Sequence, residues 1–172
     1  NSDLANDLGN LASRTLKMIQ NYFDGKIPEP GGSEGGDGEL ISFSKETVDL
    51  YRKNLDDYKI SKALENVWEL ISAANRYIVA NEPWKLARDH GKKERLATVL
   101  YNAAETIRIV AAMLSPIIPD GSIAILRQMG VKTRIGSIRL KTLLWGSLKV
   151  GSKIGEVEPV YPRLDLGEFA KG

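Results

Sequence analysis

Polar and apolar positions in the first 25 residues repeat with the period of a helix. A helix turns by about 100° per residue, so residues three and four apart share a face. One side carries the apolar residues Leu4, Leu8, Leu11, Ala12, Leu16, Met18, Ile19 and Phe23. The opposite side carries Asn6, Asn10, Arg14, Lys17 and Asn21. This pattern predicts an amphipathic helix that ends near residues 24–25, with one face packed and the other free to bind.

Four later segments show the same three-and-four spacing. They predict helices near Lys45 to Asp57, Ile60 to Val79, Lys92 to Leu114 and Ser122 to Met129. The segment from Lys92 to Leu114 has the longest apolar stripe, so we expect it to be the central helix. The sequence therefore predicts an all-α fold, a bundle of about five main helices over about residues 1–130, within a single domain of residues 1–172.

Two regions lack this periodicity. Residues 26–43 contain a glycine-rich run, but Glu34, Asp37 and Glu39 would repel a phosphate and no Lys-Ser or Lys-Thr follows. A mobile connector is therefore the preferred interpretation. Residues 131–172 are expected to form an irregular C-terminal extension, with turns, a short helix and a hairpin-like strand over 140–148 and 156–166.

Composition narrows the possible chemistry. The chain of 172 residues has no cysteine and a single histidine, His90, so neither a structural zinc site nor a thiol nucleophile or Ser-His-Asp triad is expected. No run approaches the roughly 18 uninterrupted apolar residues of a membrane span, which predicts a soluble protein with no membrane partner. The first residues lack an initiator Met and a signal peptide, and we interpret the chain as a piece of a longer protein.

The net charge of +2 is small, but the charge is unevenly distributed. Residues 121–155 contain no acidic residue and seven basic ones, namely Arg127, Lys132, Arg134, Arg139, Lys141, Lys149 and Lys153. Such a stretch suits phosphates or an acidic neighbouring domain, and equally a solvated tail.

Asn10 and Arg14 lie one turn apart, and Trp84 follows Pro83 where the helical periodicity breaks. Amide and guanidinium groups hydrogen-bond to the edges of unpaired RNA bases, and an indole stacks on their faces. An ordinary solvated face is the alternative. Trp68, in contrast, falls within a buried stripe and is expected in the core.

Several motifs together resemble a known family. They are Asn6-x-x-x-Asn10-Leu11-Ala12-Ser13-Arg14, Trp68, Asn75-Arg76-Tyr77-Ile78, Asn81-Glu82-Pro83-Trp84-Lys85-Leu86-Ala87, Leu100-Tyr101-Asn102, Leu114-Ser115-Pro116, Trp145-Gly146 and Val160-Tyr161-Pro162-Arg163. In order and spacing they resemble the C-terminal anticodon-binding domain of methionyl-tRNA synthetases, over nearly the whole chain. Tyr161 is a mild departure, because the family usually carries Phe there.

The resemblance implies that the chain is part of a class I aminoacyl-tRNA synthetase, a ligase that attaches methionine to its tRNA using ATP with Mg. The nucleotide-binding domain with its HIGH-type and KMSKS-type signatures is missing from this sequence, so the chain alone should carry no catalytic site, metal or cofactor. Zinc in the missing domain is left open. The implied partners are the anticodon loop of methionine tRNA and the catalytic domain of the same chain, in the cytoplasm.

In the family, three residues read the anticodon, and they match Asn10, Arg14 and Trp84. The first anticodon base, a cytosine, draws most of the specificity. Asn6, one turn before Asn10, is expected either to assist it or to cap the helix or pack against the protein. Charge and position alone suggest Lys17 and Arg88 as phosphate contacts.

Two alternatives of other kinds stay open at this point. A helical protein-interaction module would use the same amphipathic stripes without affinity for RNA. The anticodon domain of a related class I synthetase, such as one for cysteine or leucine, would share the bundle. It should not need Asn10-x-x-x-Arg14 together with Pro83-Trp84, so that pairing favours the methionine enzyme.

Overall fold

The computed structural model describes residues 4–133, 137–140 and 143–161, with side chains from Asp7 onward. Its helices are η1 (Leu4–Gly9, a π-helical turn), α1 (Asn10–Tyr22), α2 (Asp37–Asp56), α3 (Ile60–Asn81), α4 (Pro83–Leu86), η2 (His90–Lys92, a 3₁₀ turn), α5 (Lys93–Leu114) and α6 (Pro119–Gln128). Within the described ranges, the β pairing consists of one isolated antiparallel bridge between Lys26 and Lys153. The prediction of an all-α bundle of about five main helices is confirmed, the five being α1, α2, α3, α5 and α6.

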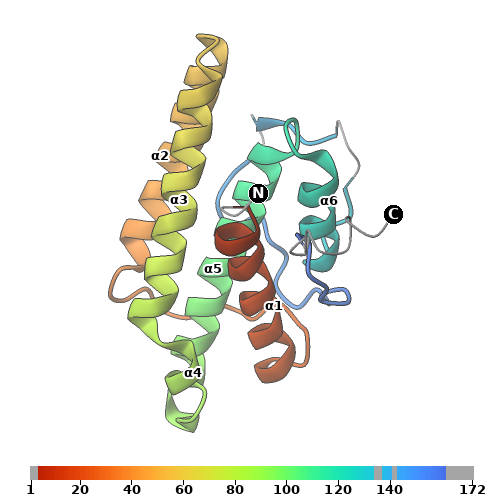
Figure 1. Cartoon of the computed structure of the whole chain (residues 1–172). Coiled ribbons are helices and arrows are strands. Elements are labelled where there is room, and N and C mark those ends of the chain that lie inside the picture. Colours follow the sequence, from red (N-terminus) through yellow and green to blue (C-terminus); the bar gives the residue numbers. More distant parts are fainter. Residues whose placement is uncertain (1–3, 134–136, 141–142, 162–172) are drawn as a thin grey trace, which may run out of the picture.

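Helix α5 runs through the middle of the bundle. Helices α2 and α3 pair as a long hairpin on one side of it, and α1 and α6 lie on the other (Figure 1). Every residue from Leu96 to Leu114 is buried, so this helix is covered on all sides, as its long apolar stripe predicts. The Tyr51 hydroxyl of α2 donates a buried hydrogen bond of 2.6 Å to the carbonyl oxygen of Met113 and ties α2 to α5.

By length and composition alone, the segment His90–Leu114 could cross a membrane. In the structure, however, its apolar window is entirely buried inside the protein. A helix enclosed by its neighbours is the ordinary core helix of a globular bundle.

Helix α2 begins earlier than its sequence pattern suggests. The predicted start near Lys45 is wrong, because the helix already begins at Asp37 in the glycine-rich run. The carboxylate of Asp37 is fully buried and accepts hydrogen bonds from Arg95 on α5 and Tyr77 on α3. These tertiary contacts, together with the favourable position of an acid in a first helical turn, outweigh the poor helix propensity of the glycines.

The expected mobile connector over residues 26–43 is also corrected. Its first part is held by the amide of Ile27, which donates to the carbonyl of Ser152 at 3.0 Å. Its middle is held by the amide of Gly31, which donates to the hydroxyl of Thr98 at 2.8 Å. Its last part is helical from Asp37 onward. The segment is therefore a structured strap across the end of the bundle.

The C-terminal extension is fixed by polar side chains on α5. Glu105 and Arg108 form a buried ion pair with two hydrogen bonds of 2.8 Å. The carboxylate of Glu105 also accepts from the amides of Ser147 and Leu148, and Arg108 donates to the carbonyl of Leu144 at 2.7 Å. The motif Trp145-Gly146 thus lies in a turn that the central helix holds.

The expected local structure of the extension is only partly correct. The turns are present, but the expected hairpin-like strand is not formed over the described parts of 140–148 and 156–166, and the extension's bridge lies instead at Lys153. Residues 162–166 lie outside the described residues. Tyr161 is half-buried, and its hydroxyl is buried beside Gly121 without a hydrogen-bond partner among the described residues. A phenylalanine would fit this environment without leaving a buried hydroxyl unsatisfied.

Replacing Arg108 with Met tests the buried pair. Removing one partner leaves the Glu105 charge uncompensated, so Arg108→Met should lower the free energy of unfolding by about 3 to 5 kcal/mol. The amides of Ser147 and Leu148 should also lose protection in hydrogen exchange, since their acceptor is disturbed. Arg52→Met is the matched control, because the pair of Arg52 with Asp49 is exposed and should contribute little. Equal stability of both variants in chemical denaturation would contradict the assigned role.

Candidate nucleic-acid interface

Helix α1 has the two faces that its sequence predicts. Its packed side consists of Leu11, Ala12, Thr15, Leu16, Met18 and Ile19, all buried. Its outer side exposes Asn10, Arg14, Lys17, Gln20 and Asn21. The exposed amide and guanidinium groups therefore lie one turn apart on a helix whose other face anchors it to the core. The side chain of Asn6 lies outside the described residues.

Arg14 is oriented by a residue on another helix. Its guanidinium donates a hydrogen bond of 3.1 Å to the side-chain oxygen of Asn75 on α3. Asn75 is itself held, because its amide nitrogen donates to the carbonyl oxygen of Ile71 at 3.2 Å. An arginine has five N–H donors, so this contact leaves donors available for a ligand. The sequence analysis did not predict that Asn75 orients Arg14. Its position in the motif Asn75-Arg76-Tyr77-Ile78 was the one feature of the sequence that pointed to a role for it.

Trp84 lies on α4, immediately after a sharp change of chain direction. Helix α3 ends at Asn81, and Glu82 adopts a left-handed conformation with φ of 44° that turns the chain into α4. Pro83 is buried at the first position of α4, where its fixed φ and missing N–H suit a helix start. Trp84 as a whole residue is 37% exposed. A flat aromatic face is thus accessible on a short helix that a buried proline anchors.

Trp68 differs from its predicted position. The expectation of a core residue is corrected, because Trp68 is only half-buried and packs against the edge of the core. It lines a surface hollow of about 420 Å³ together with Phe43, Glu69, Ser72 and Arg76. Its neighbours Val67 and Ile71 on α3 are buried, so Trp68 lies at the margin of the buried face of this helix rather than within it.

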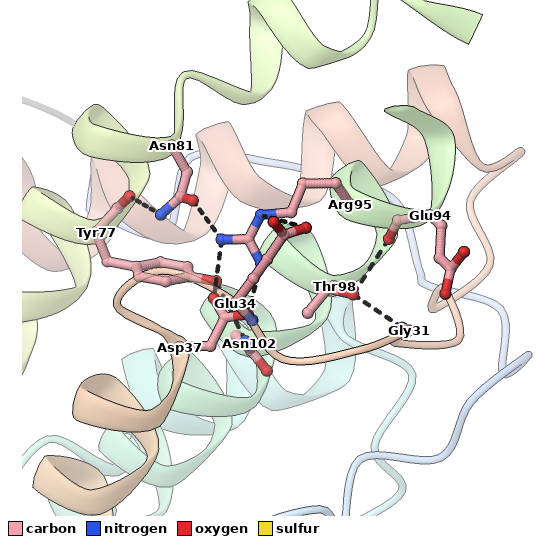
Figure 2. A network of polar contacts seen from close by, with 9 residues as sticks. All are labelled: Gly31, Glu34, Asp37, Tyr77, Asn81, Glu94, Arg95, Thr98 and Asn102. Atoms are coloured by element: carbon pink, nitrogen blue, oxygen red, sulfur yellow. Dashed lines mark hydrogen bonds and ion pairs between the residues drawn. The ribbon is translucent and has the colours of Figure 1, made fainter. Parts of the chain in front are cut away.

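A network of polar side chains includes Asn81, the last residue of α3 before the turn into α4 (Figure 2). Its centre is Arg95 of α5, whose guanidinium donates to both carboxylate oxygens of Asp37, at 2.5 and 3.0 Å. The same guanidinium donates to the side-chain oxygen of Asn81, the last residue of α3, at 2.5 Å. Asn81 in turn donates to the carbonyl oxygen of Tyr77 at 2.9 Å. Arg95 therefore joins the start of α2 to the end of α3, one residue before the turn that carries Trp84.

The Asp37 carboxylate accepts further hydrogen bonds from other members of the network. The hydroxyl of Tyr77 donates to this carboxylate at 2.5 Å, and the amide of Glu34 donates at 3.0 Å. Asn102 of α5 donates to the Tyr77 hydroxyl at 3.2 Å. Burial of the carboxylate acts to raise the pKa of Asp37, but the hydrogen bonds from Arg95, Tyr77 and Glu34 outweigh it and lower the pKa. Burial and the bond to Asp37 raise the pKa of Tyr77, so it stays a neutral donor.

The predicted site residues occupy two separate elements. Asn10, Arg14 and Lys17 share the outer face of α1, whereas Trp84 and the exposed Arg88 lie on or just after α4. Helix α3 connects the two groups, since it carries the partner of Arg14 and leads into α4. From Asn75 to Asn81 the helix advances about 9 Å, at 1.5 Å per residue. Among the described residues, no group of three or more His, Cys, Asp or Glu side chains is arranged to hold a metal ion.

The comparisons with known proteins agree with this architecture. A family model described as the anticodon binding domain of methionyl tRNA ligase matches residues 27–164. The methionine–tRNA ligase of Clostridium perfringens is 43% identical over 174 residues, covering 98% of this chain and 26% of that protein. That of Thermotoga maritima is 40% identical over 171 residues, covering 99% of this chain and 27% of that protein. The chain thus spans about a quarter of the length of the curated relatives it matches.

Solved structures show the same fold. The apo methionyl-tRNA synthetase of Mycobacterium tuberculosis superposes with a TM-score of 0.87 at 30% identity, over 96% of this chain and 33% of that one. The same enzyme in complex with methionyl-adenylate also gives a TM-score of 0.87, at 31% identity, over 95% of this chain and 32% of that one. The fold is therefore the helical bundle present in an aminoacyl-tRNA synthetase. The chain belongs to the family of anticodon-binding domains of methionyl-tRNA ligases.

The Asp37 contacts lead to a prediction about stability and pH. Asp37→Asn keeps the shape but removes the charge that pairs with Arg95, so it should lower the free energy of unfolding at pH 7 by about 3 kcal/mol. The pKa of Asp37 lies below its ordinary 3.8, so its contribution is fully present above about pH 4 and is lost as the pH falls further. The difference between the wild-type protein and the variant in urea denaturation should therefore shrink below pH 4.

Asp57→Asn is the control for this experiment. Asp57 forms an ion pair with Lys59 in which both side chains are exposed, so removing the Asp57 charge should leave stability nearly unchanged. A stability difference between Asp37→Asn and the wild-type protein that stays constant from pH 7 to pH 2 would contradict the linkage.

Proposed function

We propose that this chain is the domain with which a methionine–tRNA ligase recognises the anticodon of its tRNA. The observation that carries the proposal is the exposed pair Asn10 and Arg14, with the guanidinium of Arg14 oriented by Asn75. Membership of the anticodon-binding family supports it. The proposal treats residues 1–172 as a single anticodon-binding domain.

The chemistry of the proposed site follows from its donors and acceptors. Arg14 donates to the carbonyl oxygen and ring nitrogen of a splayed cytosine, the first anticodon base, and Asn10 both donates and accepts. Trp84 supplies a face on which an unstacked base lies. Asn75 is a positioning residue, since it holds Arg14 without needing to contact the RNA. Because the hydrogen bond to Asn75 holds the guanidinium of Arg14 before RNA binds, less rotamer entropy is lost on binding.

Other groups contribute less specific contacts in this proposal. Lys17 and Arg88 are exposed cations beside the two parts of the site, suited to phosphates rather than to bases. Asn6 precedes Asn10 by one turn and assists it.

The chemical reaction belongs to the parent enzyme in this proposal. A catalytic domain of the same chain uses ATP with Mg to activate methionine, and this domain presents the tRNA to it in the cytoplasm. The methionyl-adenylate complex of the Mycobacterium tuberculosis enzyme supports the use of ATP. Whether the catalytic domain also holds zinc stays a prediction. Because one domain recognises the anticodon and the other carries out the reaction, a single tRNA must contact both domains at once.

The pair on α1 is tested by alanine substitution. Asn10→Ala and Arg14→Ala should each weaken binding of a methionine anticodon stem-loop by about 1 to 3 kcal/mol, because each removes contacts to a base edge. Arg14→Lys should recover little, since lysine keeps the charge but lacks the planar fork. Titrations at fixed salt measure the affinity, and Gln20→Ala on the same outer face is the control. Wild-type affinity in the double alanine variant would remove both residues from the site.

Trp84 is tested separately from Trp68. As a stacking platform that is 37% exposed, Trp84→Ala should cost about 1 to 3 kcal/mol of stem-loop binding and change the melting temperature little. Trp84→Phe should fall between the wild-type protein and alanine, because a smaller ring remains. Trp68→Ala should instead lower the melting temperature and leave binding nearly unchanged. The assignment of Trp84 fails if its alanine variant unfolds or binds the stem-loop as tightly as the wild-type protein.

A further inference from the structure

The isolated bridge between the strap and the C-terminal extension brings two lysines face to face. The amide of Ile27 donates to the carbonyl of Ser152 at 3.0 Å, and the amide of Ile154 donates to the carbonyl of Gly25 at 2.8 Å. These two bonds enclose Lys26 and Lys153, which form the bridge without bonding to each other. This is the non-hydrogen-bonded pair of an antiparallel ladder, in which the side chains lie closest, with Cβ atoms about 5 Å apart.

Both lysines point away from the protein. Their neighbours Ile27 and Ile154 are 1% and 7% exposed, and side chains alternate between the two sides of an extended segment. The lysines therefore share the outer side, and both are exposed. Like charges directly opposite each other are unfavourable in a ladder, so the two ammonium groups do not stabilise the bridge.

A third lysine lies beside the pair. Lys149 begins a turn in which its carbonyl accepts from the amide of Ser152 at 3.2 Å, and Gly151 of the same turn donates to the carbonyl of Ile27 at 2.8 Å. Lys149 is also exposed. Within the part of the chain that the structure describes, no ion pair involves any of the three. We call Lys26, Lys149 and Lys153 the lysine patch.

We infer that the lysine patch binds neighbouring phosphates of the tRNA backbone. This inference rests on the proposed function and extends it to a surface outside the base-reading residues. Ammonium groups on flexible stems are well suited to phosphate oxygens, and a pair of closely spaced cations matches successive phosphates on one strand. The charge repulsion that disfavours the pair in the free protein is relieved when an anion lies between the ammonium groups.

An RNA partner explains the patch better than an acidic protein surface does. Lysine is depleted in protein–protein interfaces, whereas phosphate contacts from lysine and arginine make up much of a nucleic-acid interface. The patch also lies at the end of α1, the helix that carries Arg14 and the exposed Lys17. From Arg14 to Tyr22 that helix advances about 12 Å. Each nucleotide of a duplex strand advances about 3.4 Å, so a few nucleotides span the length of α1 from Arg14 to Tyr22.

Salt-dependent binding of a full-length methionine tRNA transcript tests the inference. Lys26→Gln with Lys153→Gln removes two phosphate contacts, so the slope of log K against log salt should decrease in magnitude by about 1.5. At about 0.15 M salt this corresponds to a Kd about 20-fold higher. Lys45→Gln with Lys53→Gln is the matched control, since both are exposed lysines on α2 and remove the same charge. The melting temperature of the patch variant should be unchanged or slightly higher, because like charges no longer face each other.

The outcomes separate this inference from the proposed function. Failure of the wild-type chain to bind the transcript above an unrelated tRNA would overturn both. Wild-type binding with an unchanged slope in the patch variant would overturn the inference alone, because the lysines would then not contact phosphates. An equal loss in the control variant would also overturn it, because net charge would then account for the effect. A fall in melting temperature of the patch variant would assign the lysines a structural role instead.

Discussion

The complete burial of α5 from Leu96 to Leu114 is the constraint on which the rest of the structure depends. A polar group on such a helix has no access to water, so it must find a partner within the protein or destabilise the fold. Each of its charged or amide side chains in the buried stretch meets this requirement by holding another segment. Glu105 and Arg108 bind the C-terminal extension, and Asn102 binds Tyr77 of α3. The central helix therefore both fills the core and determines where irregular segments attach.

The need to pair buried polar groups also determines the structure around the proposed RNA site, through Arg95. This residue lies at the edge of the buried stretch, where its guanidinium satisfies Asp37 and Asn81 together. Its contacts fix the glycine-rich strap and the end of α3, so the turn at Glu82 and the helix that carries Trp84 start from a rigid base. A left-handed conformation at a non-glycine residue is unfavourable and persists only when its surroundings determine it. The buried network supplies that support.

Charged groups in this protein differ sharply in their surroundings. Asp37 and Glu105 are buried and fully paired, and they act in stability. Arg14 is exposed and only partly paired, and the lysine patch has no acidic partner among the described residues. Unsatisfied surface cations add little to folding, since exposed pairs are worth at most about 1 kcal/mol. The buried, paired charges thus stabilise the fold. The exposed cations remain available to bind a polyanion.

By itself, the sequence determined the helices, the two faces of α1, the central place of α5 and the family. These follow from hydrophobic periodicity and local motifs, which depend on residues a few positions apart. Only the tertiary structure decided that α2 starts at Asp37, that Trp68 is half-exposed and that Asn75 orients Arg14. It also brought Lys26 opposite Lys153. Arg14 and Asn75 are 61 positions apart, and Asp37 and Arg95 are 58 apart. A local pattern carries no information about such partners, because only the folded packing brings them together.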